Sequence, residues 1–353
     1  MITRIAWVMA VCLVNVYGLV AQEVPRASTC ADLAKLRFPN ATVTDARIVA
    51  GTFVLPHAQP ASPEFFSAYD KLPAFCRVQA TLTPSRDSHI AAEVWLPRSH
   101  WNGRLLGVGN GGFGGSISYF RLGESVHSGY AVAATDTGHQ GGPRDSEWAN
   151  GHREKQIDFD FRAIHETAVI AKALIRAFYG KPPEHSYFSS CSNGGRQGLM
   201  EAERFPDDYD GVMAGAPALS MGFTTHVSGK FDGFRARGGK IVIYHGSEDG
   251  PQSSIDLYNQ LVSGLGQKRV DEFLQLYIVP GMHHCGGGPV PNDLGQWVRP
   301  DADADHSMLK SLERWVEKDV RPGCITATQW NVDGDASSGA LRTSRICRYK
   351  SQP

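Results

Sequence analysis

The chain has 353 residues, of which 42% are hydrophobic and 20% are charged, and its formal net charge is −1 at pH 7. This composition is typical of a globular protein, and the balanced charge gives no reason to expect nucleic acid or an anionic membrane as a partner. A chain of this length can bury one large core, or one core with a small attachment.

The first 21 residues have the pattern of a secretory signal peptide. Arg4 supplies a positive charge, residues 5–20 are mostly apolar, and the segment ends in the small residue Ala21. The apolar run is short for a transmembrane helix. We therefore predict a mature protein that begins near Gln22, is secreted or periplasmic, and has no membrane contact after cleavage. A retained N-terminal anchor is the alternative.

The rest of the chain, residues 22–353, is predicted to form a single α/β domain. Residues 30–84 mix Pro, Gly and short apolar runs, which suggests an N-terminal cap on the core. Beyond them, strand-like and helix-like segments alternate, and this alternation predicts a mostly parallel central sheet covered by helices on both faces. A hairpin is expected at 329–349. The expected strands are 90–96, 104–108, 129–134, 186–190, 211–214, 240–244 and 273–279, and the expected helices are 159–179, 231–237 and 306–320.

A candidate nucleophile lies in the turn between the strand 186–190 and the helix-forming residues that follow. Ser192 stands two residues before Gly194, as in the strand–turn–helix nucleophile elbow of α/β-hydrolases. Ser190 occupies the position where the general motif has glycine, and serine is small enough to pass there. An ordinary Gly-rich turn is the alternative interpretation.

A candidate base and a candidate acid follow later strands. His283 and His284 lie on a loop after residues 273–279, where an acid–base histidine of a hydrolase belongs. Glu248 and Asp249 end the β-branched run that begins at Ile241, and either can orient the histidine. The chain order of serine, acid and histidine is that of α/β-hydrolases. We do not predict a metal at His283 and His284, because two adjacent histidines cannot easily chelate one ion.

Residues 107–112 form a glycine-rich segment after a strand and match G-x-G-x-x-G. A dinucleotide site would need a helix to begin at once, but residues 113–116 continue the loop. We predict an oxyanion loop instead, with the backbone N–H of Gly111 or Gly112 as one donor and that of Asn193 as the other. A simple turn remains an alternative.

Other charged residues receive structural assignments. Asp136 and His139, on a loop that ends a strand, are expected to be structural or supporting groups. Glu154, Asp158 and Asp160 are expected to lie on a solvated face.

The chain resembles the tannase/feruloyl esterase family of α/β-hydrolases, which also contains mono(2-hydroxyethyl) terephthalate hydrolases. The resemblance extends from about Cys30 to about Cys347. Its motifs are 191–198 (CSNGGRQG), 215–217 (GAP), 245–246 (HG) with Asp249, 284–288 (HCGGG), 134–139 (ATDTGH) and 109–113 (GNGGF).

The resemblance implies a catalytic set of Ser192, Asp249 and His284, since Asp249 rather than Glu248 falls at the family's acid position. Outside the predicted signal peptide the chain has six cysteines, an even number that indicates disulfides in an exported protein. The family pattern and proximity in sequence favour three pairs. These pairs are Cys30–Cys76, Cys191–Cys285 and Cys324–Cys347.

Family members commonly carry a large lid domain after the Gly-Ala-Pro motif. Here about 22 residues connect Pro217 to Lys240, so the lid is expected to be reduced to a short crossover at residues 218–230. Neither the lid's acyl contacts nor its calcium ligands carry over to this chain, and we predict no metal and no cofactor. A second copy of the chain covering the cleft, as in a homodimer, is an alternative.

These observations predict a secreted serine carboxylic-ester hydrolase that acts through an acyl-enzyme on small aromatic esters of the hydroxycinnamoyl, galloyl or benzoyl type. The alternatives are a carboxylesterase of broad specificity or an acyltransferase with an open cleft, and a non-catalytic binding protein on the same scaffold.

Overall fold

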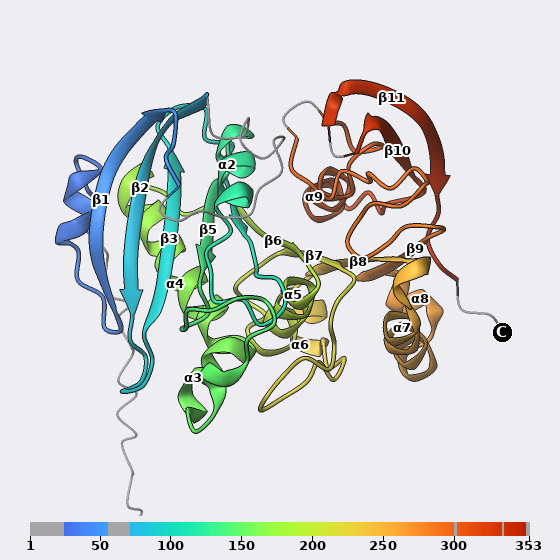
Figure 1. Cartoon of the computed structure of the whole chain (residues 1–353), viewed down its shortest axis with the longest axis horizontal. Coiled ribbons are helices and arrows are strands. Elements are labelled where there is room, and N and C mark those ends of the chain that lie inside the picture. The colour runs from blue at the N-terminus through green and yellow to red at the C-terminus, as the bar shows by residue number, and fades with distance from the viewer. Residues whose placement is uncertain (1–24, 56–70, 300–301, 334, 351–353) are drawn as a thin grey trace, which may run out of the picture.

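A large central sheet organises the computed structural model of the protein, which describes residues 25–55, 71–299, 302–333 and 335–350. The predicted signal peptide lies outside these residues. The strand order is β1-β2-β3-β5-β4-β6-β7-β8-β9 (Figure 1). The nine strands are β1 (Ala41–Gly51), β2 (Leu72–Leu82), β3 (Ile90–Pro97), β4 (Arg104–Gly107), β5 (Ala131–Thr135), β6 (His185–Cys191), β7 (Gly211–Gly215), β8 (Lys240–Gly246) and β9 (Leu274–Val279).

The sheet has an antiparallel part and a parallel part. Strands β1, β2, β3 and β5 pair antiparallel in succession, and the pairs from β5 through β4 to β9 are all parallel. The predicted mostly parallel sheet is therefore confirmed. The predicted N-terminal cap is wrong, because β1 and β2 extend the sheet edge. β2 pairs with the edge of β3 and β1 pairs with β2, so backbone hydrogen bonds join this segment to the main sheet.

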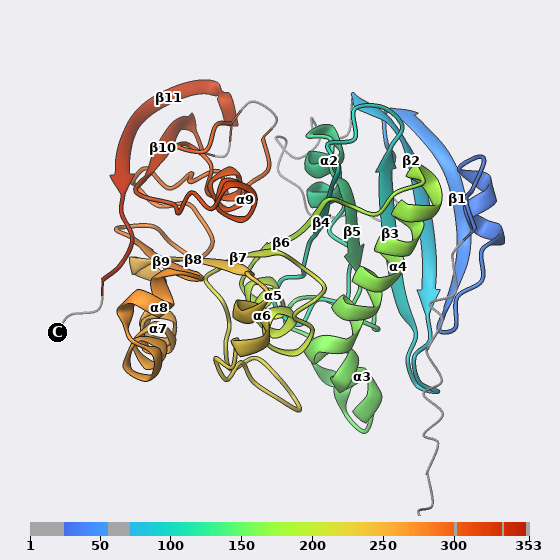
Figure 2. The same cartoon turned by 180° about the vertical axis from the view of Figure 1, so that it is seen from behind.

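Helices cover both faces of the sheet (Figures 1 and 2). One face packs against α2 (Tyr119–His127) and α9 (Met308–Lys318). Four further helices contribute to the cores of the other face together with α4: α5 (Asn193–Arg204), α6 (Asp232–Ala236), α7 (Gln252–Leu265) and α8 (Gln267–Asp271). Helix α4 spans Ala163–Tyr179, and α3 (Arg153–Ile157) with a π-helical turn (Asp158–Arg162) leads into it.

Coverage on both faces explains the apolar runs of the central strands. Neighbouring residues point to opposite faces. Met213 and Val242 join the core beneath α9, whereas Val212 and Ile241 join the core beneath α5 and α7. All four side chains are buried. Strands buried in this way read as continuous apolar runs rather than as alternating ones.

A separate hairpin follows α9 and packs against the same core (Figure 1). It consists of β10 (Ile325–Val332) and β11 (Asp335–Ile346). The sequence predicts that the hairpin begins at Gln329, but its first strand begins at Ile325, because the chain pairs directly after Cys324.

The three disulfides are those that the resemblance implies. Cys30 bonds to Cys76 of β2, Cys191 to Cys285, and Cys324 to Cys347, which fastens the open end of the hairpin. In the part of the chain that the structure describes, no helix is both long and apolar enough to cross a membrane.

Candidate active site

The predicted site residues follow four strands of the parallel part of the sheet. Gly111 and Gly112 follow β4, Ser192 follows β6, Asp249 follows β8 and His284 follows β9. Because these strands run parallel, their carboxyl ends meet at one edge of the sheet, which is where ligands bind in open α/β sheets.

The turn at Ser192 holds the serine in an unusual backbone conformation. Its φ is 64° and its ψ −126°, a region that non-glycine residues rarely adopt and that costs roughly 1–3 kcal/mol. The Ser192 N–H donates to Gly215 O at 2.9 Å, and Ser192 O accepts from Arg196 N at 3.1 Å, which begins α5. The turn is thus held by the next strand on one side and by the helix on the other.

A small residue is required at position 194 because of Ser190. A Cβ on Gly194 would lie 2.0 Å from Ser190 Oγ, and one on Gly195 would lie 2.4 Å from Gly215 O. Ser190, which replaces the usual glycine of the motif, therefore fits because position 194 is a glycine.

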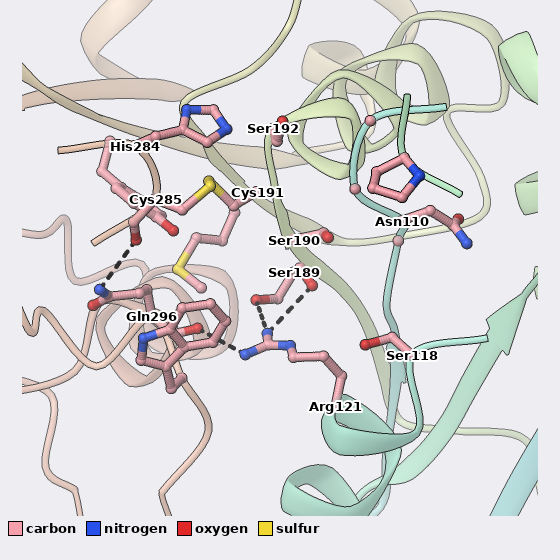
Figure 3. A pocket seen from close by; sticks show the side chains of 17 residues that line it. Asn110, Ser118, Arg121, Ser189, Ser190, Cys191, Ser192, His284, Cys285 and Gln296 are labelled. Carbon is pink, nitrogen blue, oxygen red and sulfur yellow. Dashed lines mark hydrogen bonds between the residues drawn. A yellow bond between two sulfur atoms is a disulfide. The ribbon is translucent and has the colours of Figure 1, made fainter. Parts of the chain in front are cut away.

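His284 is oriented by Asp249. Its Nδ1 lies 2.6 Å from Asp249 Oδ2, so Nδ1 carries the proton and Nε2 stays free. Glu248, the competing acid, instead accepts from Ser247 Oγ at 3.1 Å. The imidazole is 52% exposed and lies beside Ser192 in the same pocket (Figure 3). Among the described residues no hydrogen bond joins the Ser192 hydroxyl to His284, and such bonds commonly tighten only when substrate is bound.

The disulfide Cys191–Cys285 joins the residue before Ser192 to the residue after His284 (Figure 3). Their Cα atoms are 5.9 Å apart. A covalent link thus connects the loop after β6 to the loop after β9, at the point where the serine and the histidine must meet.

A second histidine, not predicted as a site residue, holds the same carboxylate. His245 Nε2 lies 3.1 Å from Asp249 Oδ2, and its Nδ1 lies 2.8 Å from Ser254 Oγ. Burial lowers the pKa of His245, although the Asp249 charge opposes this shift. Because a carboxylate can only accept, the Nε2–H group of His245 donates to Asp249. The sequence signal for this role was His245 itself, a polar residue near the end of the largely apolar strand β8.

The glycine-rich loop after β4 lies against the elbow. The N–H groups of Phe113 and Gly114 donate to Pro143 O and Gly111 O, both at 3.0 Å. Those of Gly111 and Gly112 donate to no described residue, and both glycines line the pocket beside Ser192. The first N–H groups of a helix have no intrahelical acceptor, so the Asn193 N–H at the start of α5 is also available.

His139 fastens this loop to the loop after β5, and Asp136 holds that second loop in place. His139 Nε2 lies 2.7 Å from Phe113 O, and Asp136 Oδ1 accepts from the N–H groups of Gly138 and Ala91, both at 2.9 Å. This arrangement agrees with the structural assignment of Asp136 and His139.

The prediction of a solvated face is wrong for Asp158 and Asp160, whose side chains are fully buried. Asp158 pairs with Arg162 at 2.6 Å. Asp160 accepts from Phe223 N at 2.9 Å and from Thr224 N at 2.6 Å. The π-helical turn packs against α5, so its acids face backbone donors and a guanidinium rather than water.

The pocket around Ser192 has a volume of about 370 Å³ and a charged group in its wall (Figure 3). Arg121 of α2 is buried, donates to Ser189 Oγ at 3.0 Å and to Gln296 O at 3.2 Å, and lies 5.1 Å from the Trp297 ring centroid. Sequence reasoning missed Arg121, Gln296 and Trp297, since no motif marks them. The lining residues are Gly109, Asn110, Gly111, Gly112, Ser118, Arg121, Pro143, Ser189, Ser190, Cys191, Ser192, Met213, Tyr244, His284, Cys285, Gln296 and Trp297.

Together the sheet, the strained elbow and the strand-end histidine define the α/β-hydrolase class. Comparison with known proteins gives the family. The chain belongs to the tannase and feruloyl esterase family, whose sequence profile matches residues 76–231 and 224–353. The two matched segments meet within the connection between β7 and β8. Membership makes the protein a carboxylic-ester hydrolase.

Relatives of known sequence include an uncharacterised esterase of Xanthomonas campestris, 25% identical over 525 positions that cover 94% of this chain and 89% of the relative. Feruloyl esterase B of Aspergillus niger is 36% identical over 198 residues, 56% of this chain and 37% of that protein. The chain thus matches well under half the length of that fungal relative.

Solved structures agree in fold. Feruloyl esterase B of Aspergillus oryzae superposes with a TM-score of 0.78 at 22% identity, over 91% of this chain and 95% of that chain. Tannin acyl hydrolase of Aspergillus niger superposes with a TM-score of 0.66 at 16% identity, over 93% and 90%.

Proposed function

We propose that the protein hydrolyses esters of aromatic acids through an acyl-enzyme on Ser192. The observation that carries this proposal is the strained elbow serine, which shares one pocket with a histidine whose Nδ1 is held by Asp249.

In the proposed reaction, His284 Nε2 takes the proton of the Ser192 hydroxyl as Oγ attacks the ester carbonyl carbon. The oxyanion that forms is held by the N–H groups of Asn193 and of Gly112 or Gly111. The C–O bond to the alcohol then breaks, and the imidazolium returns its proton to the leaving alcohol. Water attacks the acyl-enzyme by the same route and releases the acid. Asp249 stabilises the imidazolium throughout.

Two observations support an aromatic acyl group in the substrate: the lining of the pocket and the names of the relatives. The pocket's apolar lining includes Trp297, Tyr244 and Met213, and about 370 Å³ falls within the range that small-molecule sites occupy, roughly 300–1,000 Å³. The relatives named above include feruloyl esterases and a tannin acyl hydrolase. A hydroxycinnamoyl, galloyl or benzoyl group is the proposed acyl part.

The lid is proposed to be replaced by a short fixed loop. The crossover after β7 is attached to the π-helical turn through Asp160, and Arg196 of α5 donates to Asp160 O at 2.9 Å. The residues that line the pocket include none from 218–230, so the crossover adds few contacts that distinguish one acid from another. One methylene-sized contact changes specificity by only about 1–3 kcal/mol. We therefore propose an open cleft, broad acyl tolerance and high KM values.

Stopped-flow hydrolysis of a chromogenic aryl ester tests the mechanism. An acyl-enzyme predicts a burst of aryl alcohol equal to the enzyme concentration, followed by a slower steady rate. A binding protein on this scaffold would release no alcohol. Partition of the product toward a transester in the presence of added alcohol would identify an acyltransferase instead.

A panel of methyl ferulate, methyl gallate and short alkyl esters tests the substrate class. We expect activity on all aromatic members, with kcat/KM values that differ by no more than about 100-fold. Sharp selectivity for one acid would show that residues 218–230, or a second copy of the chain, enclose the acyl group after all.

We further propose that residues 1–21 are removed on export and that residues 22–353 form one domain in an oxidising compartment. The three disulfides support this location, because such bonds persist in secreted and periplasmic proteins. Mass spectrometry of protein from the periplasm and the medium should give a mature N-terminus near Gln22, and an intact N-terminus in the membrane fraction would contradict it.

A further inference from the structure

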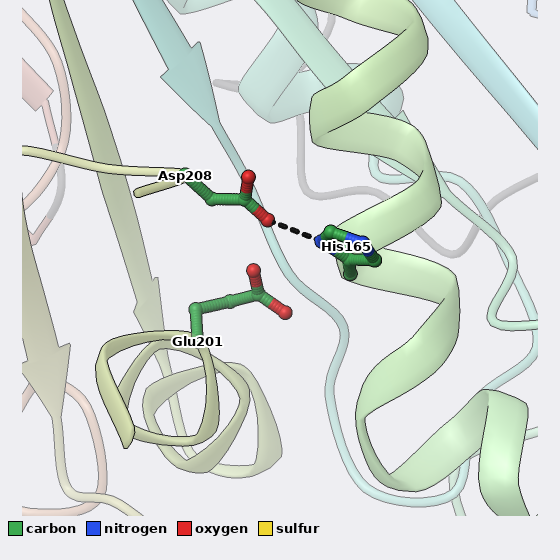
Figure 4. A group of neighbouring side chains, drawn as sticks. All are labelled: His165, Glu201 and Asp208. Atoms are coloured by element: carbon green, nitrogen blue, oxygen red, sulfur yellow. Dashed lines mark hydrogen bonds and ion pairs between the residues drawn. The ribbon is translucent and has the colours of Figure 1, made fainter. Parts of the chain in front are cut away.

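Three side chains, two of them buried, gather near the C-terminal end of α5, the end away from Ser192. Figure 4 shows the three. His165 comes from α4, Glu201 from the last turn of α5, and Asp208 from the loop before β7. Their ligand atoms lie within 4.8 Å of one another, and no other group of three or more His, Cys, Asp or Glu side chains in the described part of the chain meets this condition. The sequence analysis singled out none of the three.

Glu201 is the residue that requires an explanation. Its side chain is 1% exposed, and neither carboxylate oxygen has a hydrogen-bond partner among the described residues. In Figure 4 the carboxylate points into the space between Asp208 and His165. A carboxylate buried without a donor is costly, and a second carboxylate beside it raises that cost by repulsion. A positive species beside Glu201, either a proton or a metal cation, would offset this cost.

The third side chain favours a cation. His165 Nδ1 lies 2.6 Å from Asp208 Oδ2, and the imidazole is stacked on the Phe205 ring with centroids 3.8 Å apart. The stacking holds the ring so that Nδ1 faces the carboxylates. A proton shared by two acids needs no imidazole, whereas one imidazole with two carboxylates is a ligand set that suits zinc.

We propose that His165, Glu201 and Asp208 bind a zinc ion that stabilises the α4–α5 pair. Zinc ligands lie about 2.0–2.2 Å from the ion, so binding needs side-chain rotations that replace the hydrogen bond between His165 Nδ1 and Asp208 Oδ2 by a bond from each atom to zinc. The side chain of His165 is 28% exposed, which leaves an entry path and room for water as a fourth ligand.

The neighbouring lysine is compatible with this site. Lys172 Nζ donates to Asp207 O at 2.9 Å and lies 3.8 Å from Asp208 Oδ1, so it does not contact Oδ2, the oxygen that faces His165. Burial and the Asp208 charge raise the pKa of Glu201 well above its usual value, so protons compete with the ion. Glu201 is nine residues along the helix from Ser192, about 13 Å, so the site is structural and does not contact the ester.

The test is calorimetric titration of untagged, EDTA-treated protein with zinc chloride, followed by thermal unfolding with and without zinc. We expect one zinc per chain and a higher Tm with zinc. Glu201→Gln and the part-exposed His165→Gln should each weaken binding at least about tenfold. The matched control is Asp87→Asn, which removes an exposed carboxylate 3.0 Å from His152 and should leave zinc binding unchanged.

Calcium and magnesium chloride serve as further probes and should not bind, because these ions prefer all-oxygen sites. Cobalt(II) should give a visible absorption band that His165→Gln abolishes, a readout independent of esterase activity. No zinc binding by the unmodified chain would assign the space to a shared proton and overturn the proposal. Stoichiometric binding that survives both His165→Gln and Glu201→Gln would place the ion elsewhere and overturn it equally.

Discussion

Two carboxylates in this protein are each surrounded by partners, yet only one has the geometry for chemistry. Glu93 of β3 is 1% exposed and accepts from Trp95 Nε1 and Tyr119 Oη, both at 2.8 Å, from Gln79 at 3.1 Å, and from two nitrogens of Arg77. Every partner comes from the antiparallel strands or from α2. Both carboxylate oxygens of Glu93 are therefore occupied by donors of the fold itself.

Asp249, in contrast, lies at a strand end in the parallel part of the sheet. Its Oδ2 serves two imidazoles, the buried His245 and the half-exposed His284. The Nε2 of His284 bonds to none of the described residues, and the imidazole lines the pocket. Glu93 is buried and fully hydrogen-bonded, so it contributes to stability alone. Asp249 is also hydrogen-bonded, but one of its partners is a half-exposed histidine that can still act on a ligand.

The largest effect on activity is expected at Ser192 and at His284, the half-exposed partner of Asp249. Ser192→Ala and His284→Ala should each lower kcat by roughly 10⁴-fold or more, since removal of either member of a serine–histidine pair abolishes nucleophilic attack. Both variants should unfold at the same denaturant concentration as the unmodified protein. Steady-state kinetics on an aryl ester measures the effect, and a Ser192→Ala protein that keeps most of its activity would refute the mechanism.

The opposite result is expected for the Glu93 cluster. Glu93→Ala leaves the buried Arg77 charge unpaired, and breaking a buried ion pair costs about 3–5 kcal/mol of unfolding free energy. Urea unfolding measures this loss, while kcat of the folded protein should stay unchanged. The exposed pair Lys181–Glu184 provides the control, and Glu184→Ala should have no measurable effect. A fall in kcat without loss of stability would show that Glu93 acts in the site.

Removing the Cys191–Cys285 disulfide tests whether the active site depends on this covalent link. Replacing Cys191 and Cys285 with Ala should lower kcat by about 100-fold, because a misplacement of roughly 1 Å between reacting groups has this effect. Removing Cys324 and Cys347 in the same way should change stability but not kcat. Equal losses of activity in both double variants would show that the middle bridge has no positional role.

The smallest effect is expected at Glu124, whose carboxylate lies 3.3 Å from Arg121 between the two regions. Burial raises the pKa of Glu124 to about 7, although Arg121 and Arg299 oppose the shift. The folded protein then keeps a proton that the unfolded chain loses above its ordinary pKa near 4.5. Stability should fall by about 1–3 kcal/mol as the pH rises from 4.5 to 7.

Glu124→Gln keeps an oxygen acceptor but cannot ionise, so it should flatten this slope. Urea unfolding of both proteins between pH 4.5 and pH 8 measures the difference. Parallel pH profiles would contradict the assignment.

The sequence alone determined those features that depend on neighbours along the chain. The strand 186–190, the turn with Ser192 and Gly194, and the histidines after residues 273–279 are each local patterns of apolar periodicity and small residues. Such patterns restrict the backbone whatever the rest of the molecule does. The family resemblance pairs Cys191 with Cys285, and this pair predicted that Ser192 and His284 lie close together.

Only the tertiary structure decided which side chains meet. The contact of His284 with Asp249 depends on the short turn after β8, and the second contact of Asp249, with His245, depends on where that strand ends. Asp160 is buried because α5 and the crossover pack over its turn, although its local sequence is that of a charged surface. Residues 72–82 became a strand of the main sheet because β3 offered an edge to pair with. These outcomes depend on contacts between distant segments, and no local pattern encodes which distant partner will be present.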